Sequence, residues 1–149
     1  MHPDFGERDV EAAKDWLCRR AREPLPDEDL RAGRSLTYRD PDGRLGVRVE
    51  VRCETDFVAR SEELEDLLRT MAMRIARSPA LRWVSRAEVP AEVAEVEERE
   101  LSAQVLLEQP FASDPRQTIG EALADFQGRV MERVEVVGFA RFDARDAGA

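Results

Sequence analysis

The chain has 149 residues, of which 37% are charged, and a net charge of −9. This length favours a single domain, and the acidic balance argues against direct binding of nucleic acid, which depends on Lys and Arg side chains that neutralise phosphates. No apolar run approaches the roughly 18 residues of a membrane-spanning helix, so no membrane partner is expected.

Cysteine and histidine are scarce, which limits the chemistry that the sequence can support. The two cysteines, Cys18 and Cys53, belong to no pair motif, and His2 is the only histidine. The sequence therefore predicts no disulfide framework, no metal site and no cofactor. The start of the chain has no signal-peptide pattern, and a reduced, cytoplasmic protein is expected.

The first thirty residues are predicted to form a short helix and a linker. Apolar residues recur at helical spacing in Asp9–Ala21, and the next segment contains Pro24 and Pro26, which disfavour a helix. We therefore divide the chain into an amino-terminal helix and linker, residues 1–30, and a core domain, residues 31–149.

Two strand-like runs follow, at residues 35–40 and 44–54, on either side of Pro41-Asp42-Gly43. Pro, Asp and Gly are typical turn residues, so the pattern predicts a β-hairpin. The second run alternates apolar and polar residues, which is typical of a strand with one buried face. Its apolar face consists of Leu45, Val47, Val49, Val51 and Cys53.

Three helices are predicted beyond the hairpin. The first begins after Ser61, which can act as its N-cap, and carries an apolar stripe from Leu64 to Ile75. The second is predicted from Pro90 to about Gln104, with many Glu side chains facing solvent. The third begins at the capping-box sequence Thr118–Glu121, and Gly128 suits its end.

The last strand is predicted over residues 133–143 and has apolar residues on both faces. Strict alternation places Val137 and Phe139 on one face, and the other face is formed by Val134, Val136, Ala140 and Phe142. A strand with two apolar faces is either sandwiched or an association surface. The intermixed elements predict an α+β fold, with a small antiparallel sheet covered by helices and preceded by a short helical segment.

The segment Thr55-Asp56-Phe57-Val58 joins the hairpin to the first of these helices and allows two interpretations. Continued strand alternation places Phe57 on the core side, where most phenylalanines lie. Alternatively, Thr55 caps a helical turn that presents Asp56 and Phe57 outwards. No phosphate-binding glycine loop occurs, and no nucleophile–histidine couple is plausible with His2 alone, so the sequence predicts no catalytic residues and no enzyme.

The run CETDFVAR, Cys53 to Arg60, resembles the signature of elongation factor Ts, the guanine-nucleotide exchange factor of elongation factor Tu. Further segments resemble landmarks of this family in the same order between about Gly46 and Asp143: AMRIA, VSRAEVPAEV, LLEQPF, TIGEAL and FARFD. The chain departs from the family in lacking most of its amino-terminal three-helix domain, and Arg52 stands where Asn is usual.

The resemblance implies that the chain binds GDP-bound elongation factor Tu and promotes GDP release during translation elongation. Asp56 and Phe57 would disturb the site that holds magnesium and the phosphates, and Thr55 and Val58 would shape the turn. Shorter family members resemble homodimers joined through sheet surfaces, for which Val137 and Phe139 are the candidates. The alternatives are a paralogue that binds elongation factor Tu without exchange activity, and a dimeric structural module with Phe57 in its core.

Overall fold

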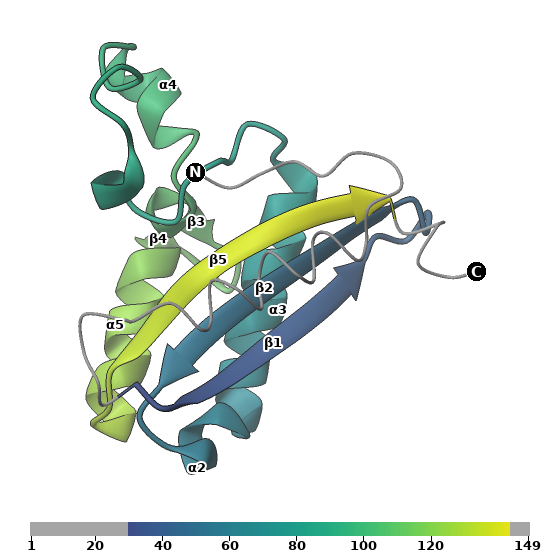
Figure 1. Ribbon diagram of the computed structural model, residues 1–149, viewed down its shortest axis with the longest axis vertical. Helices are drawn as coiled ribbons and strands as arrows, with labels where there is room; N and C mark the ends of the chain where they lie inside the picture. The colour runs from purple at the N-terminus through teal and green to yellow at the C-terminus, as the bar shows by residue number, and fades with distance from the viewer. Residues whose placement is uncertain (1–29, 144–149) are drawn as a thin grey trace.

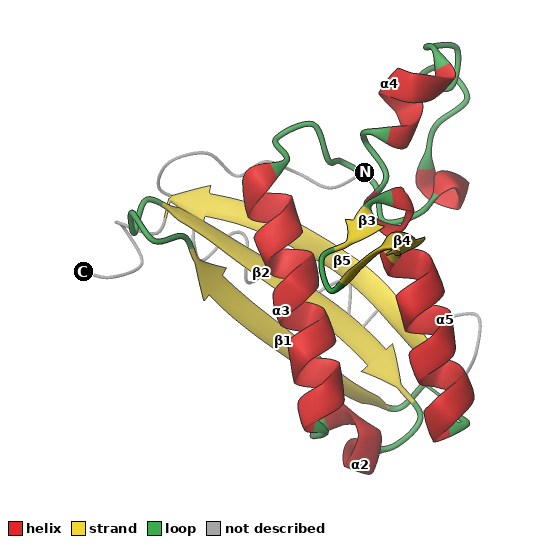
Figure 2. Ribbon diagram, turned by 180° about the vertical axis from the view of Figure 1, so that it is seen from behind, coloured by secondary structure: helices red, strands yellow, loops and turns green. Residues whose placement is uncertain are grey.

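The computed structural model describes residues 30–143, which form a three-stranded antiparallel sheet with helices on one face (Figure 1). The strands are β1 (Ala32–Arg39), β2 (Leu45–Cys53) and β5 (Val134–Asp143), and β2 lies in the middle. The helices α3 (Glu62–Arg77) and α5 (Ile119–Val130) run side by side across this face (Figure 2). The predicted α+β fold is confirmed. The predicted helix and linker, residues 1–30, lie outside the described residues except for Leu30.

The predicted hairpin is confirmed by the pairing of β1 with β2, which runs from Ala32–Cys53 to Arg39–Gly46. Its turn is closed by the Gly43 amide, which donates to the Asp40 carbonyl at 2.9 Å. Gly43 has a φ of 70°, a conformation that glycine adopts without steric cost. The predicted apolar face of β2 packs against α3 and α5 in the core.

The helix predicted after Ser61 is α3, and the Ser61 side chain accepts a hydrogen bond from the Leu64 amide. The capping box predicted at Thr118 and Glu121 is also present, at the start of α5. The predicted end at Gly128 was wrong, because α5 continues to Val130. The helix stops where Met131 takes a left-handed conformation, and the next amide bonds back to the Gln127 carbonyl.

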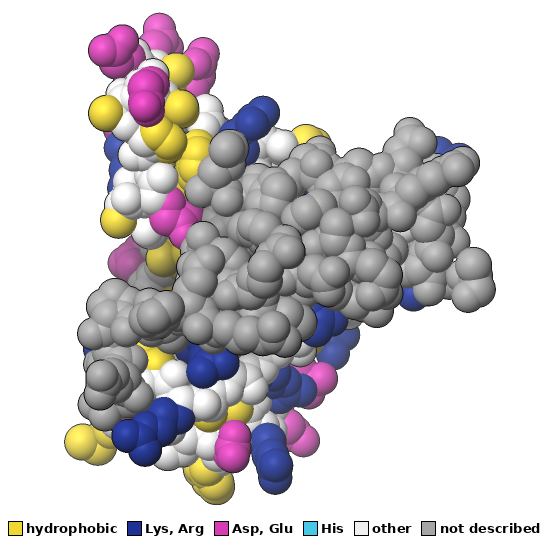
Figure 3. Space-filling view, in the orientation of Figure 1, with side chains coloured by type: hydrophobic (Ala, Val, Ile, Leu, Met, Phe, Trp, Pro, Cys, Tyr) yellow, Lys and Arg dark blue, Asp and Glu magenta, His cyan; other side chains and the backbone are white. Residues whose placement is uncertain are grey.

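The predicted helix from Pro90 to Gln104 was wrong. Turns and a bend occupy residues 91–96, and only α4 (Glu98–Ser102) is helical. The turn residues bury no side chain, and a short helix without a packed face is not stable in water. Leu101 is buried and anchors α4 to the body. Acidic side chains gather on the projecting part of the molecule around α4 (Figure 3).

Short elements connect α3 to α5. They are the 3₁₀ helices η2 (Arg86–Glu88) and η3 (Leu106–Glu108), and the strands β3 (Pro110–Phe111) and β4 (Asp114–Thr118), which pair with each other. The run VLLEQPF was interpreted as a strand or an extended loop. It contains an isolated bridge between Val105 and Trp83, then η3, then β3.

A bulge in β5 changes which residues face the core. Val51 of β2 pairs with Val136, but Glu50 pairs with Gly138, so Val137 is an extra residue. The extra residue reverses the alternation, because partners in an antiparallel sheet project to the same side. The predicted faces were therefore wrong: Phe139 pairs with Val49 and joins Val134 on the core face, whereas Ala140 and Phe142 lie on the opposite face.

Candidate functional site

The residues Thr55-Asp56-Phe57-Val58, here called the TDFV turn, lie between the end of β2 and the start of α3. They begin the one-turn helix α2 (Asp56–Ala59), for which Thr55 is the N-cap. The Thr55 hydroxyl accepts a hydrogen bond from the Val58 amide at 3.3 Å, and its carbonyl accepts one from the Ala59 amide at 3.1 Å. Of the two interpretations that the sequence allowed, the structure shows the one in which Thr55 caps a helical turn.

Helix α2 separates its two apolar side chains. Phe57 is 86% exposed, whereas Val58 is 3% exposed and belongs to the core. The alternation that placed Phe57 on the core side ends at Thr55, because a helical turn follows and changes the period from two residues to 3.6. The interpretation of Phe57 as a core residue was wrong. The alternative of a dimeric structural module assumed a buried Phe57, so the structure does not support it.

A second turn, between α5 and β5, contacts the TDFV turn. The Glu132 carboxylate accepts hydrogen bonds from the Thr55 amide at 3.1 Å and from the Thr55 hydroxyl at 2.6 Å. In the opposite direction, the Glu54 carboxylate accepts a hydrogen bond from the Arg133 amide at 2.5 Å. Glu132 of the second turn thus accepts from the TDFV turn, and Glu54, the residue just before the TDFV turn, accepts from the second turn. The TDFV turn follows Cys53, near the end of β2, and the second turn precedes Val134, the first residue of β5, which pairs with Cys53.

The carboxyl end of α2 contacts β1 through Arg34. One guanidinium nitrogen of Arg34 donates to the Ala59 carbonyl at 3.2 Å and to the Ser61 carbonyl at 3.3 Å. The other terminal nitrogen lies 3.5 Å from the Glu65 carboxylate. Arg34 therefore satisfies the Ala59 carbonyl, which a one-turn helix cannot pair internally, and it also bonds to the Ser61 carbonyl, which accepts the Glu65 amide in α3.

The chemistry around the TDFV turn does not suit nucleophilic catalysis. The Cys53 thiol donates to the Thr55 carbonyl at 3.3 Å. Its burial, with the neighbouring Glu132 as a further cause, raises the pKa of the Cys53 thiol above its ordinary value. The thiol therefore stays protonated near neutral pH, and the reactive form of cysteine is the thiolate.

Sequence reasoning missed Met131, whose side chain is 88% exposed. Its φ of 57° makes it the only residue other than glycine with a positive φ in residues 30–143. Met131 precedes Glu132, whose carboxylate bonds to Thr55, so its backbone lies close to the TDFV turn. Helix α2 and the carboxyl end of α5 lie at the same end of the sheet (Figure 1). No sequence signal distinguished this methionine, because α5 was expected to end before it, at Gly128.

Val137 and Phe139, the candidates for a surface that joins two copies of the chain, are both buried in the described fold. Phe139 is 1% exposed and lies in the core cluster with Val49 and Val134, so it does not contribute to a surface of the described fold. Val137, the extra residue of the bulge, is also buried. Neither residue lies in the TDFV turn or the turn that contacts it.

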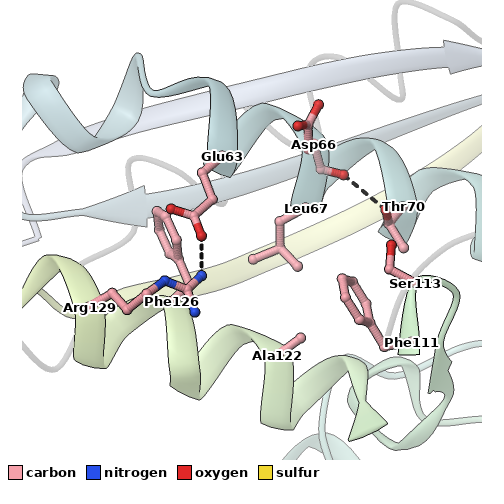
Figure 4. A pocket seen from close by; sticks show the side chains of 9 residues that line it. All are labelled: Glu63, Asp66, Leu67, Thr70, Phe111, Ser113, Ala122, Phe126 and Arg129. Carbon is pink, nitrogen blue, oxygen red and sulfur yellow. Dashed lines mark hydrogen bonds and ion pairs between the residues drawn. The ribbon is translucent and has the colours of Figure 1, made fainter. Parts of the chain in front are cut away.

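A cavity of about 140 Å³ lies between α3 and α5 (Figure 4). Its floor is apolar, and at one end Glu63 and Arg129 form an ion pair. Ser113 contributes a hydroxyl, but no histidine occurs within residues 30–143 to activate it. The same residues contain no cluster of three or more metal-binding side chains and no helix long and apolar enough to cross a membrane.

Comparison with known proteins gives a consistent set of relatives. A scan against protein-family models finds no match. The curated protein "Elongation factor Ts" of Synechococcus elongatus is 30% identical over an alignment that covers 90% of this chain and 74% of the relative. The protein of the same name from Prochlorococcus marinus is 31% identical, over 90% of this chain and 75% of the relative. The one from Trichodesmium erythraeum is 30% identical, over 89% of this chain and 74% of the relative.

Proposed function

The chain belongs to the elongation factor Ts family of translation elongation factors, and on this premise we propose that it promotes the release of GDP from elongation factor Tu. It would do so in the cytoplasm, by binding and without a covalent reaction. The TDFV turn would press against the nucleotide-binding domain of the partner, beside the magnesium ion and the phosphates of GDP.

The exposure of Phe57 is the observation that supports this proposal best. A side chain that is 86% exposed gives the fold little stability, but it can be buried by a partner. Burying one phenylalanine is worth about 1.5–3 kcal/mol, and each 1.4 kcal/mol changes an equilibrium about tenfold. Phe57 could therefore shift the affinity for GDP by roughly one to two orders of magnitude. A larger effect needs further contacts.

Asp56 and Met131 are the candidates for contacts beside Phe57. Asp56 is exposed in the first turn of α2 and would bring a negative charge towards the phosphates and their magnesium ion. Magnesium neutralises phosphate charge, so disturbing its site weakens nucleotide binding. The exposed Met131 side chain would extend the apolar contact that Phe57 begins.

This mechanism makes GDP and the exchange factor negatively coupled ligands of elongation factor Tu. Because such coupling is reciprocal, GDP should weaken the binding of this chain by the same factor by which this chain weakens the binding of GDP. Titrations of this chain into elongation factor Tu with and without GDP would measure the factor directly.

The test follows the release of a fluorescent GDP analogue from elongation factor Tu as this chain is added. We expect release to accelerate with concentration and then to saturate. Detectable binding without acceleration at saturation would refute exchange and identify a docking paralogue. No binding at all would refute the proposed partner.

A further inference from the structure

We propose that Glu132 and Arg34 are positioning residues that hold α2 at its two ends, so that Phe57 is presented in a fixed direction. This inference rests on the proposed function for its consequence in exchange. The bracing of α2 itself is a property of this chain alone and can be tested without a partner.

Helix α2 needs support from elsewhere in the fold. It has four residues, and helices much shorter than about 12 residues do not form on their own in water. A phenylalanine on a mobile loop would lose freedom on binding, and that ordering would reduce the interaction available to displace GDP. The buried side chains of Val58 and Ala59, its last two residues, hold the carboxyl half of α2, whereas Asp56 and Phe57 in its amino half are exposed.

Glu132 fixes the amino end through both polar groups of Thr55 that can donate. The Thr55 hydroxyl has one hydrogen, and the 2.6 Å contact directs it to Glu132. An oxygen lone pair then remains for the Val58 amide, which is the capping bond of α2. Without Glu132, the Thr55 hydroxyl would be free to rotate. We therefore expect the loss of Glu132 to weaken the capping bond between Thr55 and Val58, although Glu132 is not part of that bond.

Arg34 fixes the carboxyl end in a complementary way. Its guanidinium bonds to the carbonyls of Ala59 and Ser61, the last residue of α2 and the N-cap of α3. A carboxylate therefore acts on the amino end of α2 and a guanidinium on the carboxyl end. These are the charges that the unpaired amide and carbonyl groups at each end favour. Both come from distant elements, the α5–β5 turn and β1.

The variants follow from this geometry. Glu132→Ala removes both acceptors. Thr55→Val keeps the shape of the side chain but removes its hydroxyl, and Thr55→Ser keeps the hydroxyl. Arg34→Met keeps an apolar stem but removes the donors to Ala59 and Ser61. The matched control is Glu135→Ala, which removes a nearby carboxylate that pairs with Arg133.

The first readout is ¹⁵N relaxation of the amides of residues 56–60 in the free protein. We expect order parameters of about 0.85 in the wild type, in Thr55→Ser and in Glu135→Ala, and values below about 0.6 in Glu132→Ala, Thr55→Val and Arg34→Met. The amides of α3 serve as an internal reference and should stay rigid in every variant. Unchanged order in α2 of Glu132→Ala and Arg34→Met would overturn the bracing.

The second readout is GDP release from elongation factor Tu. We expect exchange efficiency to fall roughly tenfold in Glu132→Ala and Thr55→Val, the scale of losing hydrogen bonds to a charged group, and to be restored in Thr55→Ser. Mobile α2 with wild-type exchange would overturn the positioning role. If the wild type itself fails to accelerate release, the proposed function fails, and the relaxation data still decide whether the bracing exists.

Discussion

Phe57 and Val58 are neighbours in one helical turn, yet the ring of Phe57 is exposed and the side chain of Val58 lies in the core. This pair offers a matched test of what the TDFV turn does. We expect Phe57→Ala to slow exchange by roughly one to two orders of magnitude and to change the free energy of unfolding by less than about 0.5 kcal/mol. Val58→Ala should instead destabilise the fold by about 1–3 kcal/mol. GDP-release kinetics and thermal unfolding of both variants check this. A large loss of stability in Phe57→Ala would show that its ring packs within the fold.

The bulge in β5 makes Phe139 a core residue. We expect Phe139→Ala to lower the free energy of unfolding by about 3–5 kcal/mol, because the ring fills space between the sheet and its helices. Chemical denaturation measures this loss. A Phe139→Ala protein that is as stable as the wild type but has an altered oligomeric state would instead support the association surface predicted from strict alternation.

Gly46 lies opposite Phe142 in the sheet, and a Cβ atom at Gly46 would be 2.3 Å from the Phe142 ring. We expect Gly46→Ala to destabilise the protein by about 1–3 kcal/mol, because the ring must move from its packed position. The control is Gly128→Ala in α5, where a Cβ atom meets nothing within 4 Å. This change should stabilise the protein by up to about 1 kcal/mol through helix propensity. Equal melting temperatures for the two variants would contradict the packing described for Gly46.

Met131 combines an unfavourable backbone conformation with an exposed side chain, and two variants separate these features. Met131→Gly should raise the free energy of unfolding by about 0.5–1 kcal/mol, because glycine adopts a left-handed conformation without steric cost. Met131→Ala keeps the strain and should not stabilise the protein. If the side chain contacts elongation factor Tu, both variants should slow exchange to a similar extent. Wild-type exchange in both would exclude such a contact.

Arg86 connects the α4 region to the body by contacting Glu98 and Glu108 together. Its hydrogen bond to Glu98 lowers the pKa of the Glu98 carboxyl. A carboxyl whose pKa is lower in the folded state stabilises that state above its unfolded pKa, about 4.3, and loses the effect as pH falls through the folded value. We expect a ¹³C titration of the Glu98 carboxyl to have its midpoint below about 4.3 in the wild type and near that value in Arg86→Ala. Equal midpoints would show that the ion pair does not persist in solution.

Local sequence patterns determined much of the fold. The hairpin, α3 and the start of α5 each depend on groups close in the chain: a turn glycine at position 43, an N-cap at Ser61, and a capping box at Thr118. The acidic segment before α4 was mispredicted, because its residues have acceptable helix propensity but no core to pack against. The end of α5 was mispredicted because Met131, a residue that seldom adopts a left-handed conformation, does so here.

The sequence by itself indicated the family, offered the cap at Thr55 as one of two interpretations, and singled out the TDFV turn as a candidate, because these are carried by residues next to one another. The tertiary structure decided which way Phe57 faces, and it moved Phe139 into the core through one extra residue in β5. It also brought Glu132 to Thr55 across 77 positions of the chain. Such contacts depend on the register of β2 against β5, and no short pattern in either segment encodes that register.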